Sequence, residues 1–371
     1  MNVTKGRQHV KKRLSNVQSG HYDYALTFGG NHMLTYAFWN NKGGTGKTSL
    51  AFQVITRYAE THPDEKILAL DLCPQANLSE LMLGGMNANG SEKLLARQGL
   101  VPRCSIGGYF QIRLPAPYSP PTFNATDYIT NPHQSNRDIP DNIDLICGDP
   151  LLELQANAVN TLANQNIPGT NAWLAVIDWL KDLLDQLRND YDVVFLDCNP
   201  SFSFYTQIAL ANSDRIILPV MADDSSRRAI LNAISLVYSL KLPSEIYTSY
   251  MFSTKLEAAG RPLPKIHQIV QNRLTQYMGD ASAYAAVLHA IRKDVKDLIG
   301  THPHLFTFSN VANGFSSVRD FQTTGVIAHA KGQPFSKVRA GKQSINGHRV
   351  QVKSDYLQNC RVAINSLTAK F

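Results

Sequence analysis

The chain contains 371 residues, of which 43% are apolar and 18% are charged. This composition supplies a sizeable core for one large domain or two modest ones, and it excludes a disordered or fibrous protein. Five cysteines without a CxxC pair argue against a disulfide framework and a zinc ribbon. No apolar run approaches the roughly 18 residues that cross a bilayer, and no signal peptide is evident, so we expect a cytoplasmic protein.

Lysine and arginine outnumber aspartate and glutamate by 36 to 29, which gives a formal net charge of +7. The excess lies at the two ends, because residues 1–32 carry a net charge of +4 and residues 331–371 carry +7. Residues 33–330 are therefore acidic, with a net charge of −4. We expect residues 1–32 to form a basic, disordered N-terminal arm and residues 331–371 to form a basic segment that contacts an anionic partner.

The hydrophobic pattern predicts strands that alternate with helices. The predicted strands are residues 33–39, 66–71, 143–146, 191–197, 215–220, 266–274 and 305–308. The predicted helices follow residue 47 and cover 173–187, most of 229–256, and 282–298. Residues 113–141 contain six prolines, which predicts one long, irregular surface insertion. Such alternation is typical of a doubly wound α/β fold, a mostly parallel sheet with helices on both faces.

A glycine-rich segment lies between the first predicted strand and the first predicted helix. Its glycines let backbone N–H groups converge on a phosphate, and the following helix adds the positive end of its dipole. In such a loop the lysine reaches the β- and γ-phosphates and the next hydroxyl binds Mg²⁺. The predicted binding residues for ATP and Mg²⁺ are Gly43, Gly44, Thr45, Gly46, Lys47, Thr48 and Ser49.

Two features of this loop depart from the ordinary phosphate loop. Asn41 stands where a glycine is usual, and a second lysine, Lys42, follows it. The run Lys-Gly-Gly-Thr-Gly-Lys-Thr resembles the KGGxGK[ST] loop of the ParA/MinD family of deviant Walker-motif ATPases. The resemblance is closest to ParA-type partition ATPases. It implies a P-loop NTPase domain over residues 33–371 and an ATP-sandwich homodimer, in which Lys42 crosses to the partner's phosphates.

Three further segments resemble this family in the same order along the chain. Asp71 lies in a segment similar to DLDPQGNL, and Asp197 lies in one similar to YDxxxxDxPPS. The resemblance implies that both carboxylates join Thr48 around Mg²⁺ and, together with Lys42, serve catalysis. An acid at the tip of a buried apolar strand is costly unless it has such a role. Asn272 matches the asparagine that contacts adenine, and a turn cap is the alternative interpretation.

One position departs from the family pattern in a way that bears on hydrolysis. Cys73 matches the second aspartate of the DxD segment, which the family uses to position or polarise the attacking water. A thiol with an ordinary pKa near 8.5 is mostly neutral at pH 7 and accepts a proton poorly compared with a carboxylate. We therefore expect slow, partner-stimulated hydrolysis, and a nucleotide-locked scaffold that barely hydrolyses ATP is the alternative.

The basic C-terminal segment favours DNA as the anionic partner. Arg319 lies in a segment loosely similar to one that contributes to sequence-independent DNA binding in ParA, although an ion pair with Asp320 or another nearby carboxylate is the alternative. The candidate phosphate contacts in the basic segment are Lys337, Arg339 and Lys342, and a solvated basic surface is the alternative interpretation. The resemblance implies plasmid or chromosome partition or cargo positioning on the nucleoid, with a ParB-like or cargo-adaptor protein as partner.

A membrane-surface function of the MinD type is the competing interpretation. Residues 356–367 place apolar side chains on one helical face, as an interfacial helix does. The same pattern is typical of a helix that packs on the sheet of its own domain. Because the segment lacks an exposed Phe/Trp face apart from Phe371, we favour the core helix and no membrane partner.

The departure at Cys73 yields a first prediction. A Cys73→Asp substitution restores the carboxylate of the family pattern, so we expect it to raise basal ATP turnover without weakening ATP binding. Phosphate-release and nucleotide-binding assays on the two proteins measure this difference. A turnover that stays flat or falls in the variant would contradict the role assigned to position 73.

Overall fold

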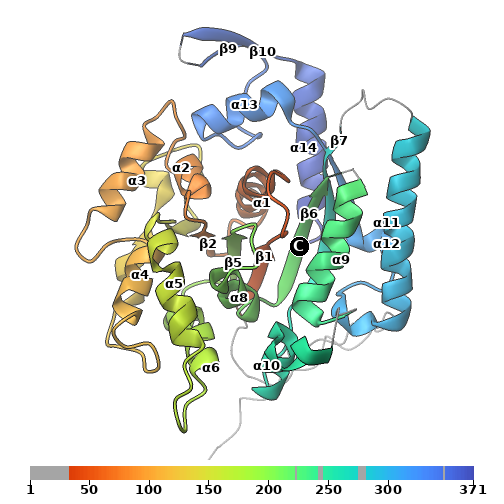
Figure 1. Cartoon of the computed structure of the whole chain (residues 1–371). Coiled ribbons are helices and arrows are strands. Elements are labelled where there is room, and N and C mark those ends of the chain that lie inside the picture. The colour runs from red at the N-terminus through yellow and green to blue at the C-terminus, as the bar shows by residue number, and fades with distance from the viewer. Residues whose placement is uncertain (1–32, 222–223, 241–244, 275–280, 346) are drawn as a thin grey trace, which may run out of the picture. The chain divides into compact units, whose positions relative to one another are not determined.

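The computed structural model describes residues 33–221, 224–240, 245–274, 281–345 and 347–371, so the predicted basic arm at 1–32 lies outside the described residues. Its centre is an eight-stranded sheet with the strand order β3-β4-β2-β5-β1-β6-β7-β8 (Figure 1). The strands are β1 (Leu34–Phe38), β2 (Ile67–Leu72), β3 (Ile129–Thr130), β4 (Ile143–Ile146), β5 (Val193–Cys198), β6 (Arg215–Met221), β7 (Lys265–Leu274) and β8 (Phe315–Arg319). Among the described strand pairs of this sheet only β3–β4 is antiparallel, which confirms the predicted mostly parallel α/β fold.

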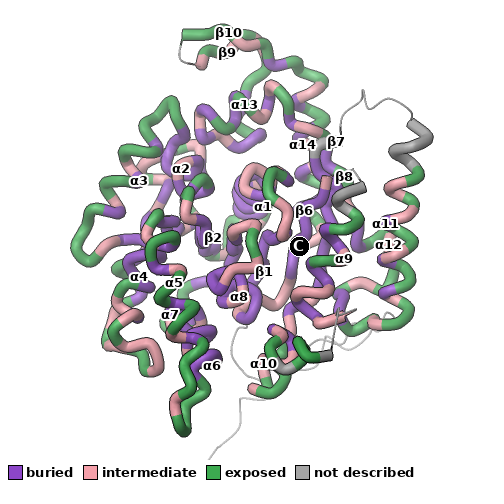
Figure 2. Tube along the Cα trace, in the orientation of Figure 1, coloured by how far each residue is buried: buried purple, intermediate pink, exposed green. Residues whose placement is uncertain are grey.

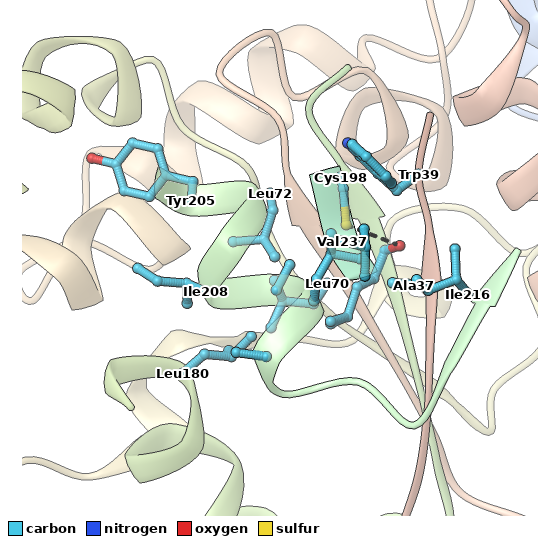
Figure 3. Packing of buried hydrophobic residues seen from close by; sticks show 14 of the residues in the cluster. Ala37, Trp39, Leu70, Leu72, Leu180, Cys198, Tyr205, Ile208, Ile216 and Val237 are labelled. Atoms are coloured by element: carbon cyan, nitrogen blue, oxygen red, sulfur yellow. Dashed lines mark hydrogen bonds between the residues drawn. The ribbon is translucent and has the colours of Figure 1, made fainter. Parts of the chain in front are cut away.

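Helices cover both faces of this sheet and bury two apolar layers (Figure 2). One face carries α1 (Lys47–Thr61), α2 (Asn77–Met82), α3 (Gly90–Gln98), α13 (Gln322–Lys331) and α14 (Ser354–Thr368). The other carries α4 (Ile106–Arg113), α5 (Leu151–Ala163), α6 (Ala172–Ile177), α7 (Trp179–Leu187), α8 (Phe204–Ala211), α9 (Asp224–Tyr238), α10 (Phe252–Ala258) and α11 (Ala281–Thr301). Side chains alternate between the two layers along each strand. Leu70 and Leu72 of β2, for example, pack beside Ile208 of α8 (Figure 3).

The predicted strand at residues 305–308 is wrong. A short 3-10 helix occupies Pro303–Leu305, and Phe306 forms only an isolated bridge with Ile266. The eighth strand is β8 instead, which follows the short helix α12 (Val311–Gly314). Its polar residues Ser316 and Ser317 interrupt the apolar pattern, because β8 is the edge of the sheet and is buried at only some positions.

Two other expectations need correction. The single helix predicted for residues 173–187 is divided at Asp178 into α6 and α7, although its apolar face is buried as expected. The insertion at 113–141 is not only a surface excursion. It forms β3, which pairs with β4 at the sheet edge, and it buries Tyr128 and Ile139 against the core. We did not predict α2 to α5 from the sequence.

The C-terminal segment ends in a core helix. α14 buries Leu357, Cys360, Ile364 and Leu367 in the same apolar layer as α1, which confirms the interpretation of residues 356–367 as a helix that packs on its own domain. Before it, α13 is followed by an antiparallel hairpin of β9 (Gly341–Ile345) and β10 (His348–Val352). Within the described residues, no helix combines the length and the apolar character that a bilayer span requires.

The chain terminus packs against the middle of the sheet. The Tyr36 hydroxyl donates to the Phe371 carbonyl at 2.9 Å, and their rings lie 4.9 Å apart. Beside them, the His267 ring bonds to the Thr307 hydroxyl and the Lys370 carbonyl, each at 2.8 Å. Burial, helped by the positive charge of Arg215, lowers the pKa of His267 to about 4. The folded protein therefore holds this imidazole neutral.

This histidine makes stability depend on pH. Its unfolded-state pKa is about 6.5, so the unfolded chain binds the proton first as pH falls, and stability is lost between about pH 6.5 and pH 4. We expect His267→Gln to remove about 2–3 kcal/mol of this loss over the same interval. Urea unfolding of both proteins at several pH values measures the difference between their unfolding free energies. The contributions of other titrating groups cancel in this difference. Parallel pH profiles for the two proteins would refute a neutral buried imidazole.

Candidate functional site

The predicted site residues meet at the carboxyl ends of the central parallel strands. Asp197 of β5 pairs in register with Phe38 of β1 on one side and with Asp71 of β2 on the other. Asn272 of β7 pairs with Met221 of β6 at the same edge of the sheet. The glycine-rich loop leaves β1 at this edge and enters α1 at Lys47. The structure therefore brings the loop, both carboxylates and the asparagine together, as the motifs predict.

The loop is held open by its own local geometry. Asn40 anchors its start, because the side-chain amide donates to the Pro219 carbonyl at 2.6 Å and the amide oxygen accepts from the Lys42 N–H at 2.9 Å. Gly44 and Gly46 have φ angles of +73° and +74°, a left-handed conformation that favours glycine. No atom lies within 4 Å of where a Cβ of Gly44 would stand, so the loop borders open space.

A buried ion pair joins the first turn of α1 to the central strand. The Lys47 ammonium donates to one oxygen of Asp197 at 2.7 Å, and the Thr48 hydroxyl donates to the other at 2.7 Å. The Lys47 side chain is 7% exposed and that of Asp197 is fully buried. Burial alone would lower the pKa of Lys47, but the charge and hydrogen bond of Asp197 outweigh it and raise the pKa. Lys47 is therefore a buried cation.

Asp71 is tied to the segment that follows its strand. One carboxylate oxygen accepts from the Cys73 N–H at 3.1 Å, and the other accepts from the N–H and hydroxyl of Ser79 at 2.9 and 2.8 Å. Burial, followed by the charge of Asp197, raises the pKa of Asp71 to about 7. Ser79 was missed from the sequence, because only the folded position of α2 directs its hydroxyl to a carboxylate eight residues away.

The site fits a phosphate group with Mg²⁺. No side chain caps the N-terminus of α1 and its first turn holds no acid, so its N–H groups and dipole are available to an anion. Two adjacent buried carboxylates, one with a raised pKa, form a negative pair that a cation relieves. Among the described residues no cluster of three His, Cys, Asp or Glu could hold a metal. This donor set suits Mg²⁺, which takes one or two carboxylates and completes its shell with phosphate and water.

Asn272 clamps the phosphate loop. Its side-chain amide donates to the Thr45 carbonyl at 2.8 Å and lies 3.5 Å from that of Gly46. The asparagine is 2% exposed and thus belongs to the wall of the site. Its contact with adenine stays a prediction, and the structure adds the positioning of the loop, which the sequence did not indicate.

Cys73 lies directly beside the carboxylate pair as a buried, neutral thiol. It is 5% exposed, and burial together with the charge of Asp71 raises its pKa to about 12. The expectation that this position carries no negative charge at pH 7 is strengthened, because the protein raises the thiol pKa above its ordinary value.

The candidate DNA contacts lie outside this site. Arg319 is exposed at the end of β8, and the described part of the chain records no ion pair between it and Asp320. Lys337, Arg339 and Lys342 are exposed in or near the β9–β10 hairpin, in a different part of the chain. Their role in DNA binding stays a prediction.

Comparison with known protein families finds a match over residues 33–244 to a family described as an AAA domain. The chain is 26% identical over 189 residues to an uncharacterized protein of Pseudomonas putida. The aligned region covers 51% of this chain and 56% of the relative. The chain is also 27% identical over 190 residues to one of Methanocaldococcus jannaschii, which covers 50% and 58%. The chain therefore spans a little more than half the length of these curated relatives.

Solved structures share the fold. The ATP complex of McdA from Cyanothece aligns with a TM-score of 0.55 at 15% identity, over 91% of this chain and 97% of that one. A plasmid partition protein from Borrelia burgdorferi aligns with a TM-score of 0.51 at 16% identity, over 91% and 100%. At this level of identity the likeness establishes the arrangement of the sheet and its helices.

The Lys47–Asp197 pair yields a prediction about stability. Asp197→Asn leaves the buried ammonium without its counter-charge, so we expect the unfolding free energy of the nucleotide-free protein to fall by about 3–5 kcal/mol. Adding Lys47→Met removes the unpaired charge and is expected to restore at least half of the loss. Urea denaturation of the three proteins tests both steps. A single variant as stable as the parent would rule out a net contribution from the pair.

Proposed function

The chain belongs to the AAA-domain family, in the ParA/MinD group of P-loop ATPases, and on that premise we propose that it is an ATP-dependent dimerising switch that binds DNA. The observation that carries the proposal is the buried Lys47–Asp197–Thr48 arrangement beneath an uncapped helix N-terminus. It places a cation suited to the phosphates, Lys47, beside an anion suited to Mg²⁺, Asp197.

Different groups in and around the loop would contact different parts of Mg-ATP. The backbone N–H groups from Gly43 to Ser49 receive the phosphates, and Lys47 turns its ammonium from Asp197 toward them. The Thr48 hydroxyl and Asp197 would hold Mg²⁺, which would supply positive charge to the phosphate oxygens. The Asn272 clamp on Thr45 and Gly46 keeps the loop in its receiving shape.

Hydrolysis is proposed to be slow. Asp71 would orient water, but three hydrogen bonds from Cys73 and Ser79 already occupy its oxygens, and the neighbouring thiol stays neutral. The isolated chain therefore offers the attacking water only a weak proton acceptor. A partner that shifts α2 would move Ser79 and free an oxygen of Asp71 for this role. An ATP-bound scaffold is the limiting case of this property, and Cys73→Asp distinguishes the two.

Dimerisation would place Lys42 on the partner's nucleotide. Lys42 lies on the rim of the loop, half-buried and next to the exposed Gly43 and Gly44. Lys47 already bonds to Asp197 of β5 within its own chain, so we assign the contact across the interface to Lys42. The ATP-bound dimer is thus proposed as the active form and the monomer as the released form.

The biological role proposed is partition of plasmids or chromosomes, or the positioning of a cargo, by a nucleoid-associated protein in the cytoplasm. The names of the structural neighbours, McdA and a plasmid partition protein, support this class of function. A ParB-like or cargo-adaptor protein would stimulate hydrolysis and release the DNA-bound dimer. The buried apolar face of α14 speaks against the competing membrane-surface function.

Lys42 and Lys47 distinguish dimerisation from nucleotide binding. We expect Lys42→Ala to bind Mg-ATP normally but to remain monomeric and to lose at least about tenfold in turnover, because a charge supplied across an interface acts on the transition state. Lys47→Ala is expected to lose binding itself. Size-exclusion chromatography with light scattering, nucleotide titration and phosphate release provide the measurements, with the exposed Lys296→Ala as control.

Two outcomes would contradict the proposal. A parent protein that gives no saturable binding of Mg-ATP is not a nucleotide switch. A Lys42→Ala protein that dimerises and hydrolyses ATP as the parent does would show that this lysine acts within its own chain or not at all.

A further inference from the structure

The fold itself uses three of the eight cations in residues 331–371. Arg361 donates to the backbone carbonyls of Phe335 and Val338 at 2.8 Å each. The Lys370 ammonium donates to the carbonyl at the start of β8 at 2.8 Å, and that of Lys331 donates to a glutamine of β9 at 2.7 Å. These three side chains hold the C-terminal segment together and are not available to a polyanion.

The other five cations are all exposed and close together in the chain. They are Lys337, Arg339, Lys342, Arg349 and Lys353. The β9–β10 hairpin carries two of them, and the residues that lead into and out of it carry the rest. The only acid of residues 331–371 is Asp355, and Glu60 of α1 reaches the same region through the Ser336 hydroxyl. A net positive surface therefore remains around the hairpin.

The hairpin has one inner and one outer face. Val350 and Val352 alternate with exposed residues and lie on the side that contacts α13. The register pairs Lys342 with Gln351 and Ser344 with Arg349, and all four of these side chains are exposed. The outer face is thus wholly polar, with two cations placed diagonally about 7–8 Å apart. Figure 2 shows the hairpin as a mostly exposed ribbon beyond α13.

The base of the hairpin is firmly attached to the domain. The bond from Lys331 to Gln343 ties α13 to β9, and Val352 is fully buried. Beside this base is a hollow of about 440 Å³ whose lining includes Lys337, Arg339 and Ser354. A polar ribbon thus projects from a fixed support, with a cationic hollow at its foot.

The chemistry of this surface fits the double helix. A two-stranded β-ribbon has the width that the major groove of B-DNA admits, about 12 Å. The outer face of the ribbon offers no apolar side chain for insertion into a lipid interface or a protein core. Cations without base-reading partners give affinity for phosphates and no sequence preference.

We propose that the β9–β10 hairpin is the DNA-contacting element of this protein, with Lys342 and Arg349 of its outer face on the phosphates that border a groove of the duplex and Lys337, Arg339 and Lys353 on the neighbouring backbone phosphates. The inference rests on the proposed function, which supplies DNA as the ligand. It names the element and the mode of contact, and it leaves Arg319 outside the contact surface.

The test compares two double variants of equal charge. Lys342→Gln/Arg349→Gln removes the outer cations of the hairpin, and Lys293→Gln/Lys296→Gln removes two exposed cations of α11. Fluorescence anisotropy follows binding of labelled duplexes of unrelated sequence by the full chain with Mg-ATP, across a salt series. Thermal unfolding and DNA-free ATP turnover, neither of which depends on the hairpin surface, verify folding.

We expect the hairpin variant to lose at least about tenfold in affinity for every duplex and to reduce the slope of log affinity against log salt by about 2, one per phosphate contact. The α11 variant is expected to bind as the parent does. If the parent binds DNA and the hairpin variant keeps its affinity and slope, the hairpin is not the contact element and DNA binding itself stands. If the parent binds phosphatidylserine vesicles but no duplex, both the hairpin inference and the proposed DNA binding fail.

Discussion

The buried carboxylate of Asp197 is the group on which the geometry of the site depends. It lies one residue before the end of the central strand β5, and its two oxygens accept from Lys47 and Thr48, the first two residues of α1. One side chain therefore fixes the start of α1, and with it the glycine-rich loop, against the middle of the sheet. It also governs the charges around it, because it keeps the buried Lys47 ionised and adds to the burial that raises the pKa of Asp71.

The sequence predicts the centre of the molecule better than its edges, for physical reasons. Strands such as β2 and β5 are buried at every position, so they are apolar runs interrupted only by an acid at the next-to-last residue. The edge strands lack this pattern, because β3 is two residues long and exists only through its pairing with β4, and β8 contains two serines. The site follows the same division. Motifs identify the loop, Asp71 and Asp197, whereas the contacts of Ser79 and Asn40 depend on segments that meet only in the folded chain.

The count of charges along the chain gains its meaning from burial. Eight cations in residues 331–371 form one basic segment in the sequence, but the structure divides them by what their donors touch. Arg361, Lys370 and Lys331 donate to internal acceptors and stabilise the packing of the segment. The cations that remain exposed are those of the hairpin and its flanks. The net charge of the segment thus overstates the number of cations that a polyanion can contact. The hairpin register indicates that a polyanion would approach from the outer face of the hairpin.

The proposed nucleotide site and the hairpin are mechanically connected, because α2 and the end of α13 cross with almost no space between them. A Cβ on Gly85 would stand 2.5 Å from the His329 carbonyl oxygen, and one on Gly332 would stand 2.4 Å from that of Leu81. Ser79 of α2 holds the Asp71 carboxylate, and α13 leads into β9. Packed interiors resist small displacements, so a change at Asp71 that moves α2 must also move α13 or separate this crossing. The two glycines make the crossing possible because they lack side chains. The backbones of the two segments are therefore in direct contact, and the crossing resists deformation.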